Sequence, residues 1–320
     1  MGNRDRETRY NLSLIPAIST VICTHNRCAL LREALASLTA QSLPSSQFEV
    51  IVVDDGSTDA TPIVAMEFAG TLPLTVLTQP NGGLSAARNA GWRAARAPLV
   101  AYLDDDARAA SDWLERILAA FAAAPAAAVV GGPVHPRWET SRPAWLPDDL
   151  LLFLTIFDLG PQEIRSDKDP VFAGASMAMQ RSWLEATGGF DQRLGRRGSS
   201  LLSHEESAWW EMARDRGGFG LYRPDIVVDH FVPAARATRT WFRRRLYWEG
   251  VSMQVRAQAV APRRHALSRF ARALNYLRVQ VLSGSSLGHV LRPWRWSREF
   301  SWQCHVCYQT GVAVTMLQAT

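Results

Sequence analysis

Over the first 135 residues, the spacing of apolar residues alternates between two patterns, and this alternation restricts the fold more than any other feature of the chain. Short apolar runs of four to six residues stand between stretches whose apolar residues recur at helical spacing. The runs do not alternate apolar with polar residues, which is typical of strands covered on both faces. Strands that alternate with helices predict βαβ units and a mostly parallel sheet flanked by helices. The predicted strands are residues 18–23, 48–53, 74–77, 99–103 and 127–130, and the predicted helices are residues 29–39, 60–68, 84–96 and 112–124.

The chain divides at a proline-rich segment and again at a change in charge. Residues 133–147 contain four prolines and predict a loop into a second half. Residues 236–320 contain 14 arginines and two acids, a net charge of +12, whereas residues 1–235 have a net charge of −7. We therefore expect an N-terminal tail over residues 1–15, an α/β domain over 16–235 with halves 16–132 and 133–235, and a basic, Trp-rich helical extension over 236–320.

The apolar residues suffice for a large core but not for a membrane span. Hydrophobic residues make up 47% of the 320 residues. The longest apolar run that we find, residues 150–157, is interrupted by Thr155, whereas a spanning helix needs roughly 20 apolar residues. The first ten residues mix both charge signs and lack the apolar core of a signal peptide. We expect a cytoplasmic protein, soluble or peripheral at the inner face of the cytoplasmic membrane.

The basic extension supports two interpretations. Arginines interleaved with tryptophans are typical of helices that lie on anionic membranes. Alternatively, the tryptophans pack the extension onto the rest of the molecule. Nucleic-acid binding is not expected, because no recognition motif accompanies the charge. The tryptophans concerned are Trp241, Trp248, Trp294, Trp296 and Trp302.

Carboxylates follow two of the predicted strands, where ligands bind in open α/β sheets. Asp55 ends the run V-V-D-D and is a candidate ligand contact, whereas Asp59 is expected to cap the next helix. Asp104, Asp105 and Asp106 are adjacent, and a like-charged pair 4 Å apart costs about 4 kcal/mol at an effective dielectric near 20. A divalent cation relieves this repulsion, and carboxylate oxygens suit Mg²⁺ or Mn²⁺.

Three further patterns are ambiguous on their own. Arg88 lies one turn into a helix that follows two glycines, where an anion could bind but a plain helix start is the better interpretation of this motif alone. Glu205 and Glu206 follow His204 at a predicted helix start, which is equally a capping pattern. His230 follows a short strand-like run and is either a ligand or a buried core histidine.

Taken in order, these patterns resemble the family 2 glycosyltransferases with the GT-A fold. The resemblance covers roughly residues 16–232, and the ordered set is far more specific than any one motif. The motifs are T-V-I-C-T-H-N-R (20–27), V-V-D-D-G-S-T-D (52–59), G-L-S-A-A-R-N-A-G (83–91), Y-L-D-D-D-A (102–107), G-A-S-M-A-M (174–179), G-G-F-D (188–191) and H-E-E (204–206).

The resemblance implies a role for each matching residue. Residues 16–132 would be the nucleotide-binding half and residues 133–235 the acceptor half. Glu206 would be the catalytic base, with Glu205 as the first acid of the pair and Gly174 and Ala175 near the acceptor. Asp106 would bind the metal, Mn²⁺ or Mg²⁺, and His230 would complete its ligands. The donor would be bound by Thr24, Asn26, Asp55 (at the nucleobase), Arg88, Asp104 and Asp105.

Two departures from the family pattern refine the expectation. The chain has His-Glu-Glu where Gly-Glu-Asp is common, so the base would be one methylene longer. Residues 241–248 match the Q-x-x-R-W motif of processive members only loosely, so we expect single-sugar transfer. The resemblance also implies inversion at the anomeric carbon, as does a single base that promotes attack opposite the leaving group. The predicted partners are a nucleotide sugar, most simply a UDP sugar, and a glycan or lipid-linked acceptor in cell-envelope or exopolysaccharide synthesis. A sugar nucleotidyltransferase and an inactive nucleotide-binding or membrane-adaptor module are the alternatives.

Overall fold

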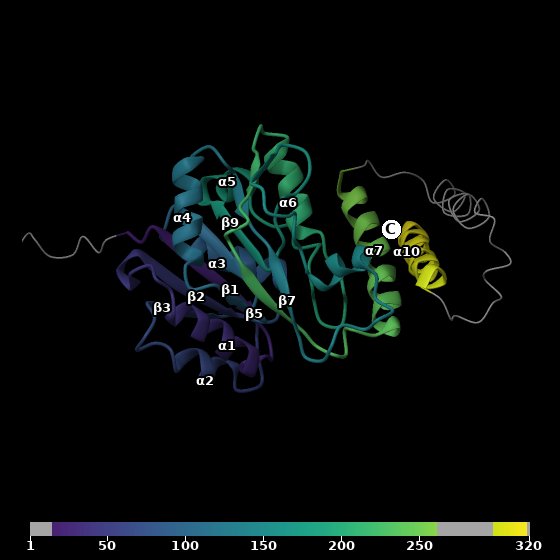
Figure 1. Cartoon of the computed structure of the whole chain (residues 1–320), viewed down its shortest axis with the longest axis horizontal. Helices are drawn as coiled ribbons and strands as arrows, with labels where there is room; N and C mark the ends of the chain where they lie inside the picture. The colour runs from purple at the N-terminus through teal and green to yellow at the C-terminus, as the bar shows by residue number, and fades with distance from the viewer. Residues whose placement is uncertain (1–14, 261–296, 319–320) are drawn as a thin grey trace, which may run out of the picture.

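A mostly parallel sheet of eight strands forms the centre of the molecule, in a computed structural model that describes residues 15–260 and 297–318 (Figure 1). Its strand order is β3-β2-β1-β4-β9-β6-β10-β8. Strands β3, β2, β1 and β4 are mutually parallel, whereas β9 runs antiparallel to both of its neighbours. These strands are β1 (Ile18–Thr24), β2 (Phe48–Asp54), β3 (Leu74–Thr78), β4 (Leu99–Leu103), β6 (Val129–Gly131), β8 (Ile164–Ser166), β9 (Ser176–Gln180) and β10 (Gly220–Tyr222).

Helices cover both faces of this sheet, which confirms the predicted α/β class. Alternate residues of one strand enter different cores: Ile18 and Ile22 of β1 face one cluster, and Val21 faces the other. Helices α1, α2 and α4 contribute to the first cluster, and α3, α5 and α6 to the second. Burial on both faces explains why the strand sequences are continuously apolar. The helices are α1 (Cys28–Thr39), α2 (Thr61–Met66), α3 (Leu84–Ala94), α4 (Trp113–Ala123), α5 (Arg181–Thr187) and α6 (Glu205–Arg214).

A second, three-stranded sheet joins distant parts of the chain. It consists of β5 (Ala107–Ala109), β11 (Val228–Val232) and β7 (Val134–Trp138), in the order β5-β11-β7. Strand β5 starts directly after the acidic triplet, and its antiparallel pairing with β11 sets His230 opposite Ala107. His230 was expected to follow a strand-like run, whereas it lies within β11, which begins at Val228. Two short 3₁₀ helices complete the described elements before residue 235, at Ser45–Gln47 and Asp148–Leu154.

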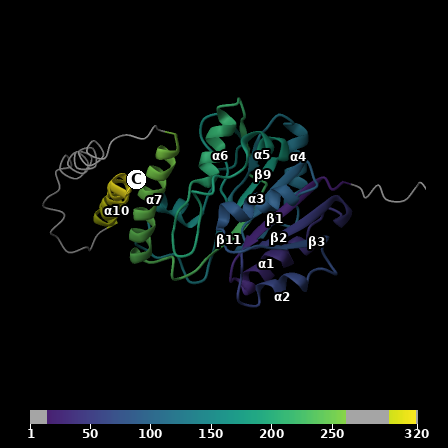
Figure 2. The same cartoon turned by 180° about the vertical axis from the view of Figure 1, so that it is seen from behind.

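The C-terminal extension contains two described helices, α7 (Arg239–Val260) and α10 (Ser297–Gln318). Both views show them at the opposite end of the molecule from β3 (Figures 1 and 2). Phe242 and Leu246 of α7 and Phe300 and Cys304 of α10 bury a third apolar cluster with the 3₁₀ helix at Asp148–Leu154. Residues 239–260 and 297–318 of the predicted extension are therefore helical, and they pack on the domain.

One tryptophan of the extension, Trp241, takes part in this packing. Trp241 is half-buried against this third cluster, with its ring centroid 5.1 Å from that of Phe242. Trp294 and Trp296 lie outside the described residues. No helix within residues 15–260 or 297–318 combines the length and the apolar character needed to cross a membrane.

Side-chain capping at α4 differs from what its sequence suggests. The spacing of Asp112 and Glu115 is typical of a capping box, yet Asp112 makes no capping bond and instead accepts from Arg116 Nε at 3.0 Å. Glu115 accepts from the hydroxyl of Ser42 at 2.6 Å.

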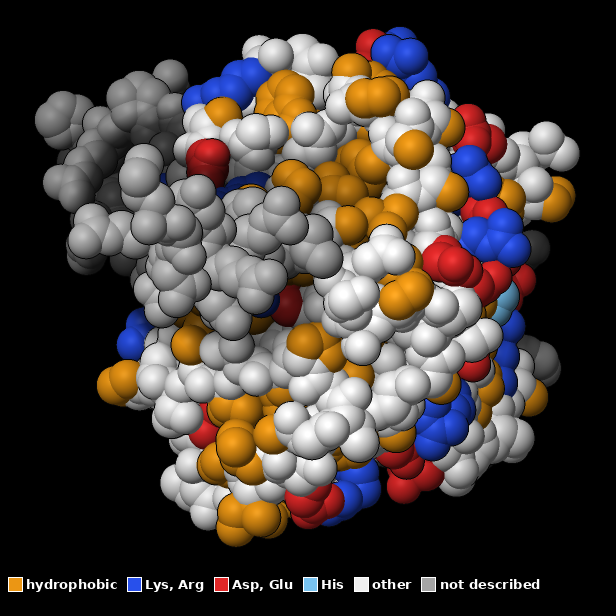
Figure 3. Space-filling model, turned by 90° about the vertical axis from the view of Figure 1, so that its left-hand side faces the viewer, with side chains coloured by type: hydrophobic (Ala, Val, Ile, Leu, Met, Phe, Trp, Pro, Cys, Tyr) orange, Lys and Arg blue, Asp and Glu red, His pale blue; other side chains and the backbone are white. Residues whose placement is uncertain are grey.

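The end of the molecule that carries β3 has a mixed surface, in which hydrophobic side chains lie among arginines, aspartates and glutamates (Figure 3). Helix α2 exposes Ile63 and Met66. Single exposed apolar side chains are ordinary on proteins.

Candidate active site

The predicted carboxylates lie at the edge of the sheet where its parallel strands end. Asp55 follows β2, and the acidic triplet follows β4, with β1 between these two strands. Asp105 and Asp106 are buried, and Asp104 is half-buried. Since parallel strands end at the same edge, the sequence alone could predict that these groups share one region.

Asp104, Asp106 and His230 form a candidate cation site. One potential ligand atom from each residue lies within 4.8 Å of the others. The Nε2 atom of His230 lies 3.1 Å from Asp106 Oδ1, while the buried Nδ1 atom of the same ring has no hydrogen-bond partner among the described residues. Two carboxylates and an imidazole suit Mn²⁺ or Mg²⁺, and the unpartnered ring nitrogen is consistent with a ligand that would be added. The residues therefore fit the predicted metal.

Two arginines compensate the charge of the triplet. Arg27 Nη1 donates to Asp105 Oδ1 and to Asp106 Oδ2, both at 2.8 Å. Arg236 Nη1 lies 3.6 Å from Asp106 Oδ2. Burial alone would raise the pKa of Asp106, but His230, Arg27 and Arg236 hold that pKa well below its usual range. Asp106 is therefore an ionised carboxylate.

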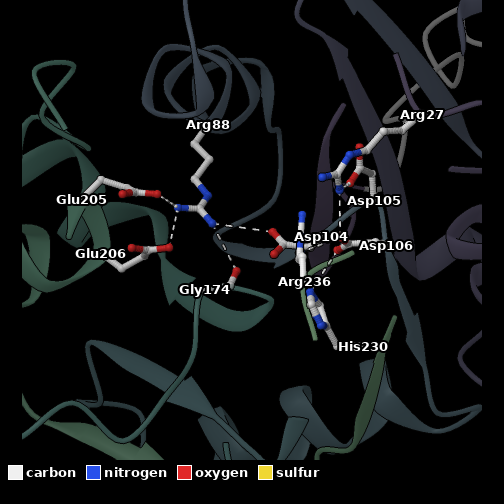
Figure 4. A network of polar contacts seen from close by, with 10 residues as sticks. All are labelled: Arg27, Arg88, Asp104, Asp105, Asp106, Gly174, Glu205, Glu206, His230 and Arg236. Atoms are coloured by element: carbon white, nitrogen blue, oxygen red, sulfur yellow. Dashed lines mark hydrogen bonds and ion pairs between the residues drawn. The ribbon is translucent and has the colours of Figure 1, made fainter. Parts of the chain in front are cut away.

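Arg88 connects the triplet to the acid pair (Figure 4). Its Nη1 atom donates to Glu205 Oε1 and Glu206 Oε1, both at 2.8 Å, and its Nη2 atom lies 3.6 Å from Asp104 Oδ1. The same Nη2 donates to the carbonyl oxygen of Gly174 at 3.3 Å. The Arg88 side chain is only 2% exposed, so these carboxylates are its main charge compensation.

Gly174 is required by this close packing. A Cβ atom there would lie 2.1 Å from Glu206 Oε1 and 3.1 Å from Arg88 Nη2. Ala175, which is fully buried, accepts a hydrogen bond at its carbonyl oxygen from the backbone N–H of Asp104. The predicted acceptor residues Gly174 and Ala175 therefore touch both the acid pair and the triplet through the backbone.

The remaining predicted donor residues lie around the ends of β1 and β2. Asp55 Oδ1 accepts from the backbone N–H of Gly82, and Asp55 Oδ2 from that of Gly83, both at 2.8 Å. Thr24 is buried at the end of β1. Asn26 has a positive φ of 54° and accepts from the Thr58 N–H at 2.7 Å. Asp55 thus holds the glycine loop before α3, and Asn26 holds the loop after β2.

Comparison with known proteins identifies the family. Residues 19–188 match the family described as "Glycosyl transferase family 2". The chain belongs to glycosyl transferase family 2. It is therefore a glycosyltransferase, and the two alternative functions are set aside.

Relatives and a solved structure agree with this assignment. A glucosyl-dolichyl phosphate glucuronosyltransferase of Haloferax volcanii is 27% identical over 74% of this chain and 76% of its own. The succinoglycan biosynthesis protein ExoM of Rhizobium meliloti is also 27% identical, over 77% of this chain and 76% of its own. The mannosyltransferase PcManGT of Pyrobaculum calidifontis, 23% identical, superposes with a TM-score of 0.62 over 94% of this chain and 87% of its own. Its likeness confirms the predicted GT-A-type fold.

The two acids of this glycosyltransferase differ in protonation. Burial and the charge of Glu206 raise the pKa of Glu205 to about 8, although Arg88 opposes the shift. Burial would also raise the pKa of Glu206, but Arg88 and backbone N–H groups at the start of α6 lower it below its ordinary value. Glu206 is therefore the ionised acid at neutral pH, and Glu205 is the acid of the pair that takes up a proton more readily.

Sequence reasoning missed three arginines of the site. Arg27 lies inside the T-H-N-R motif, so its place beside two strand ends was a usable signal. Arg196 and Arg236 belong to no motif. Burial and the nearby charges of Arg245 and Arg236 lower the pKa of Arg196 to about 10, and burial also lowers the pKa of Arg236 despite the nearby charge of Asp106. Both are half-buried cations with incomplete charge compensation.

Proposed function

We propose that this glycosyltransferase transfers one sugar, with inversion, from a UDP sugar to an acceptor hydroxyl in cell-envelope or exopolysaccharide synthesis. The observation that carries the proposal is the position of Arg88 between the acid pair and Asp104. The candidate base and the candidate cation site are thereby held on two sides of one buried arginine. A transferase that must activate an acceptor and stabilise a diphosphate needs both.

Donor binding would use the edge of the sheet. Asp104, Asp106 and His230 would hold Mn²⁺ or Mg²⁺, which when bound stabilises negative charge on the diphosphate. Arg196 and Arg236, whose pKa values are lowered, would gain a compensating anion from the same diphosphate. The solved mannosyltransferase PcManGT is described in complex with GDP-Man and Mn²⁺, so GDP sugars should be tested beside UDP sugars.

The nucleoside would lie beside the loops that follow β1 and β2. Thr24 and Asn26 border this region, and Asp105 lies beside Arg27 at the end of β4. Asp55 Oδ2 accepts one backbone bond, which leaves a lone pair for the N–H of a nucleobase. We assign residues 16–132 to the nucleotide and residues 133–235 to the acceptor.

Chemistry at the acid pair follows from its protonation. Ionised Glu206 would accept the proton of the acceptor hydroxyl as its oxygen attacks the anomeric carbon. The bond from that carbon to the diphosphate oxygen breaks, and the diphosphate leaves with the bonding electron pair. Attack opposite the leaving group inverts the configuration. Glu205, whose pKa is raised, would be the poorer base of the two at neutral pH.

The basic extension would contact an anionic membrane. Its net charge of +12 supports this, since each basic residue near an anionic surface adds about 1 kcal/mol. A lipid-linked acceptor would then be presented at the inner face of the membrane, and the relative from Haloferax volcanii has a dolichyl phosphate in its name. Vesicle flotation tests this: we expect binding to phosphatidylserine vesicles that salt weakens. Equal binding to neutral vesicles, or none at low salt, contradicts it.

A donor screen tests the transferase proposal. The purified chain is incubated with UDP and GDP sugars and Mn²⁺, and released nucleoside diphosphate is measured with and without a chelator. We expect release from one donor, dependent on metal. NMR of a transferred product would show the inverted anomer. No release from any donor refutes the donor proposal, and a retained anomer refutes inversion.

A further inference from the structure

The segment before α6 is held by helix α7 of the extension. The Ser203 N–H donates to Ser252 Oγ at 3.1 Å, and Arg245 Nη2 donates to Ser203 Oγ at 3.1 Å. Arg244 Nη2 donates to the carbonyl oxygen of Ser199 at 2.7 Å. Side chains along α7 thus contact the residues that lead directly into the acid pair.

His204, the residue before the acid pair, has an unusual backbone. Its φ of 78° and ψ of 10° lie in the left-handed region, which residues other than glycine seldom adopt. His204 is the N-cap of α6, yet its side chain makes no capping bond. Such a conformation persists only where surrounding contacts hold it. The contact that holds it must therefore be found outside α6.

Glu249 of α7 supplies that contact. The Nε2 atom of His204 lies 2.6 Å from Glu249 Oε1, and Arg256 Nη1 lies 3.3 Å from His204 Nδ1. Because arginine only donates, Nδ1 accepts from Arg256, and Nε2 donates its hydrogen to Glu249. Arg245 Nη1 donates to Glu249 Oε2 at 2.8 Å. His204 and Glu249 are each only 15% exposed, so water competes little with this bond.

Helix α7 is in turn fixed against α10. A Cβ atom on Gly250 would lie 2.0 Å from the carbonyl oxygen of Tyr308, and one on Gly311 would lie 2.0 Å from that of Tyr247. The two helices therefore touch backbone to backbone. A helix fixed in this way can hold Glu249 in one position.

We propose that Glu249 is a positioning residue that, through His204, sets the start of α6 and so aims Glu205 and Glu206 at the site. The inference rests on the proposed role of Glu206. It makes the extension part of the catalytic apparatus, whatever surface the extension also binds. Glu249 touches neither acid. It contacts His204 at 2.6 Å and, more weakly, Ser203 Oγ, which donates to Glu249 Oε2 at 3.4 Å, so its effect would pass through the backbone of these two residues and mainly through His204.

A double-mutant cycle tests this. The variants are Glu249→Ala, His204→Gly and the double variant, since glycine adopts the left-handed conformation without help. Arg243→Ala is the matched control, because Arg243 is on the same helix but contacts Gln303 of α10. The readouts are kcat and donor KM, and hydrogen exchange of residues 203–208.

Glu249→Ala should lower kcat about 10- to 100-fold while donor KM stays within about twofold, because small displacements of a catalytic group cost rate at this scale. Exchange at residues 203–208 should quicken. Glu249→Gln, which still accepts from His204, should recover part of the rate. In the His204→Gly background, Glu249→Ala should have no further effect. Arg243→Ala should leave kcat and this exchange as in the wild-type chain.

If Glu249→Ala has the kcat of the wild-type chain and the same hydrogen exchange at residues 203–208, the proposal is overturned. Additive losses in the double variant would also overturn it, because Glu249 would then act by another route. If the wild-type chain transfers no sugar, the proposed function fails, and the exchange cycle alone decides whether Glu249 positions α6.

Discussion

Replacing Arg88 with methionine tests the charge balance at the centre of the site. The change keeps an unbranched, mostly apolar stem and removes the guanidinium, in a side chain that is 2% exposed. Three carboxylates lose their partner: Glu205 and Glu206, each at 2.8 Å, and Asp104, at 3.6 Å. Removing one partner of a buried ion pair costs about 3–5 kcal/mol. We expect Arg88→Met to lower the free energy of unfolding by about this amount at pH 8.

The loss should depend on pH in a definite direction. Arg88 keeps the pKa of Glu206 below its ordinary value. Without Arg88, burial dominates, and the pKa of Glu206 in the folded state should rise above its unfolded value. An acid whose folded pKa is raised destabilises the protein above that pKa, and the penalty disappears as pH falls. The loss should therefore shrink from pH 8 toward pH 5.5, by at most about 1.4 kcal/mol per pH unit for each proton involved.

Urea unfolding at pH 5.5 and pH 8, followed by tryptophan fluorescence, measures both effects. Arg116→Met is the matched control, because Arg116 is 48% exposed and pairs with Asp112 at the surface, where such pairs contribute about 0–1 kcal/mol. A loss below about 1 kcal/mol for Arg88→Met at pH 8, or the same loss at both pH values, would refute the assigned charge balance.

Three further outcomes follow. Glu206→Gln should lower transfer about 10²–10⁴-fold with little change in donor KM; if Glu205→Gln has this effect instead, the base is Glu205. Asp106→Asn should weaken Mn²⁺ binding measured by calorimetry without donor present, and unchanged binding would remove Asp106 from the ligands. Gly311→Ala should lower the melting temperature, since its Cβ would lie 2.0 Å from the Tyr247 carbonyl oxygen and such overpacking costs about 1–3 kcal/mol. An unchanged melting temperature would contradict the close helix contact.

Local sequence determined the elements of the domain and the edge at which its carboxylates lie. Residues 48–53 and 84–96 were predicted as strand and helix, and the structure has Phe48–Asp54 and Leu84–Ala94. The spacing of apolar residues indicates whether a segment is buried on one face or on both. This spacing is a local property, because it involves only residues that are close together in the chain. Parallel strands end at one edge, so acids that follow β2 and β4 had to share a region. The ordered motifs then indicated the family.

Only the tertiary structure decided how these groups are paired. Sequence placed Arg88 at a helix start, where an anion or nothing could bind, but its partners lie on α6, more than 100 residues away. The spacing of Asp112 and Glu115 suggests a capping box, but Glu115 instead accepts a hydrogen bond from the hydroxyl of Ser42, which lies in another segment of the chain. His204, whose backbone is left-handed, has its side-chain partner in Glu249, 45 residues further along the chain. Such contacts form only when the folded backbone brings distant side chains together, and no local pattern encodes them.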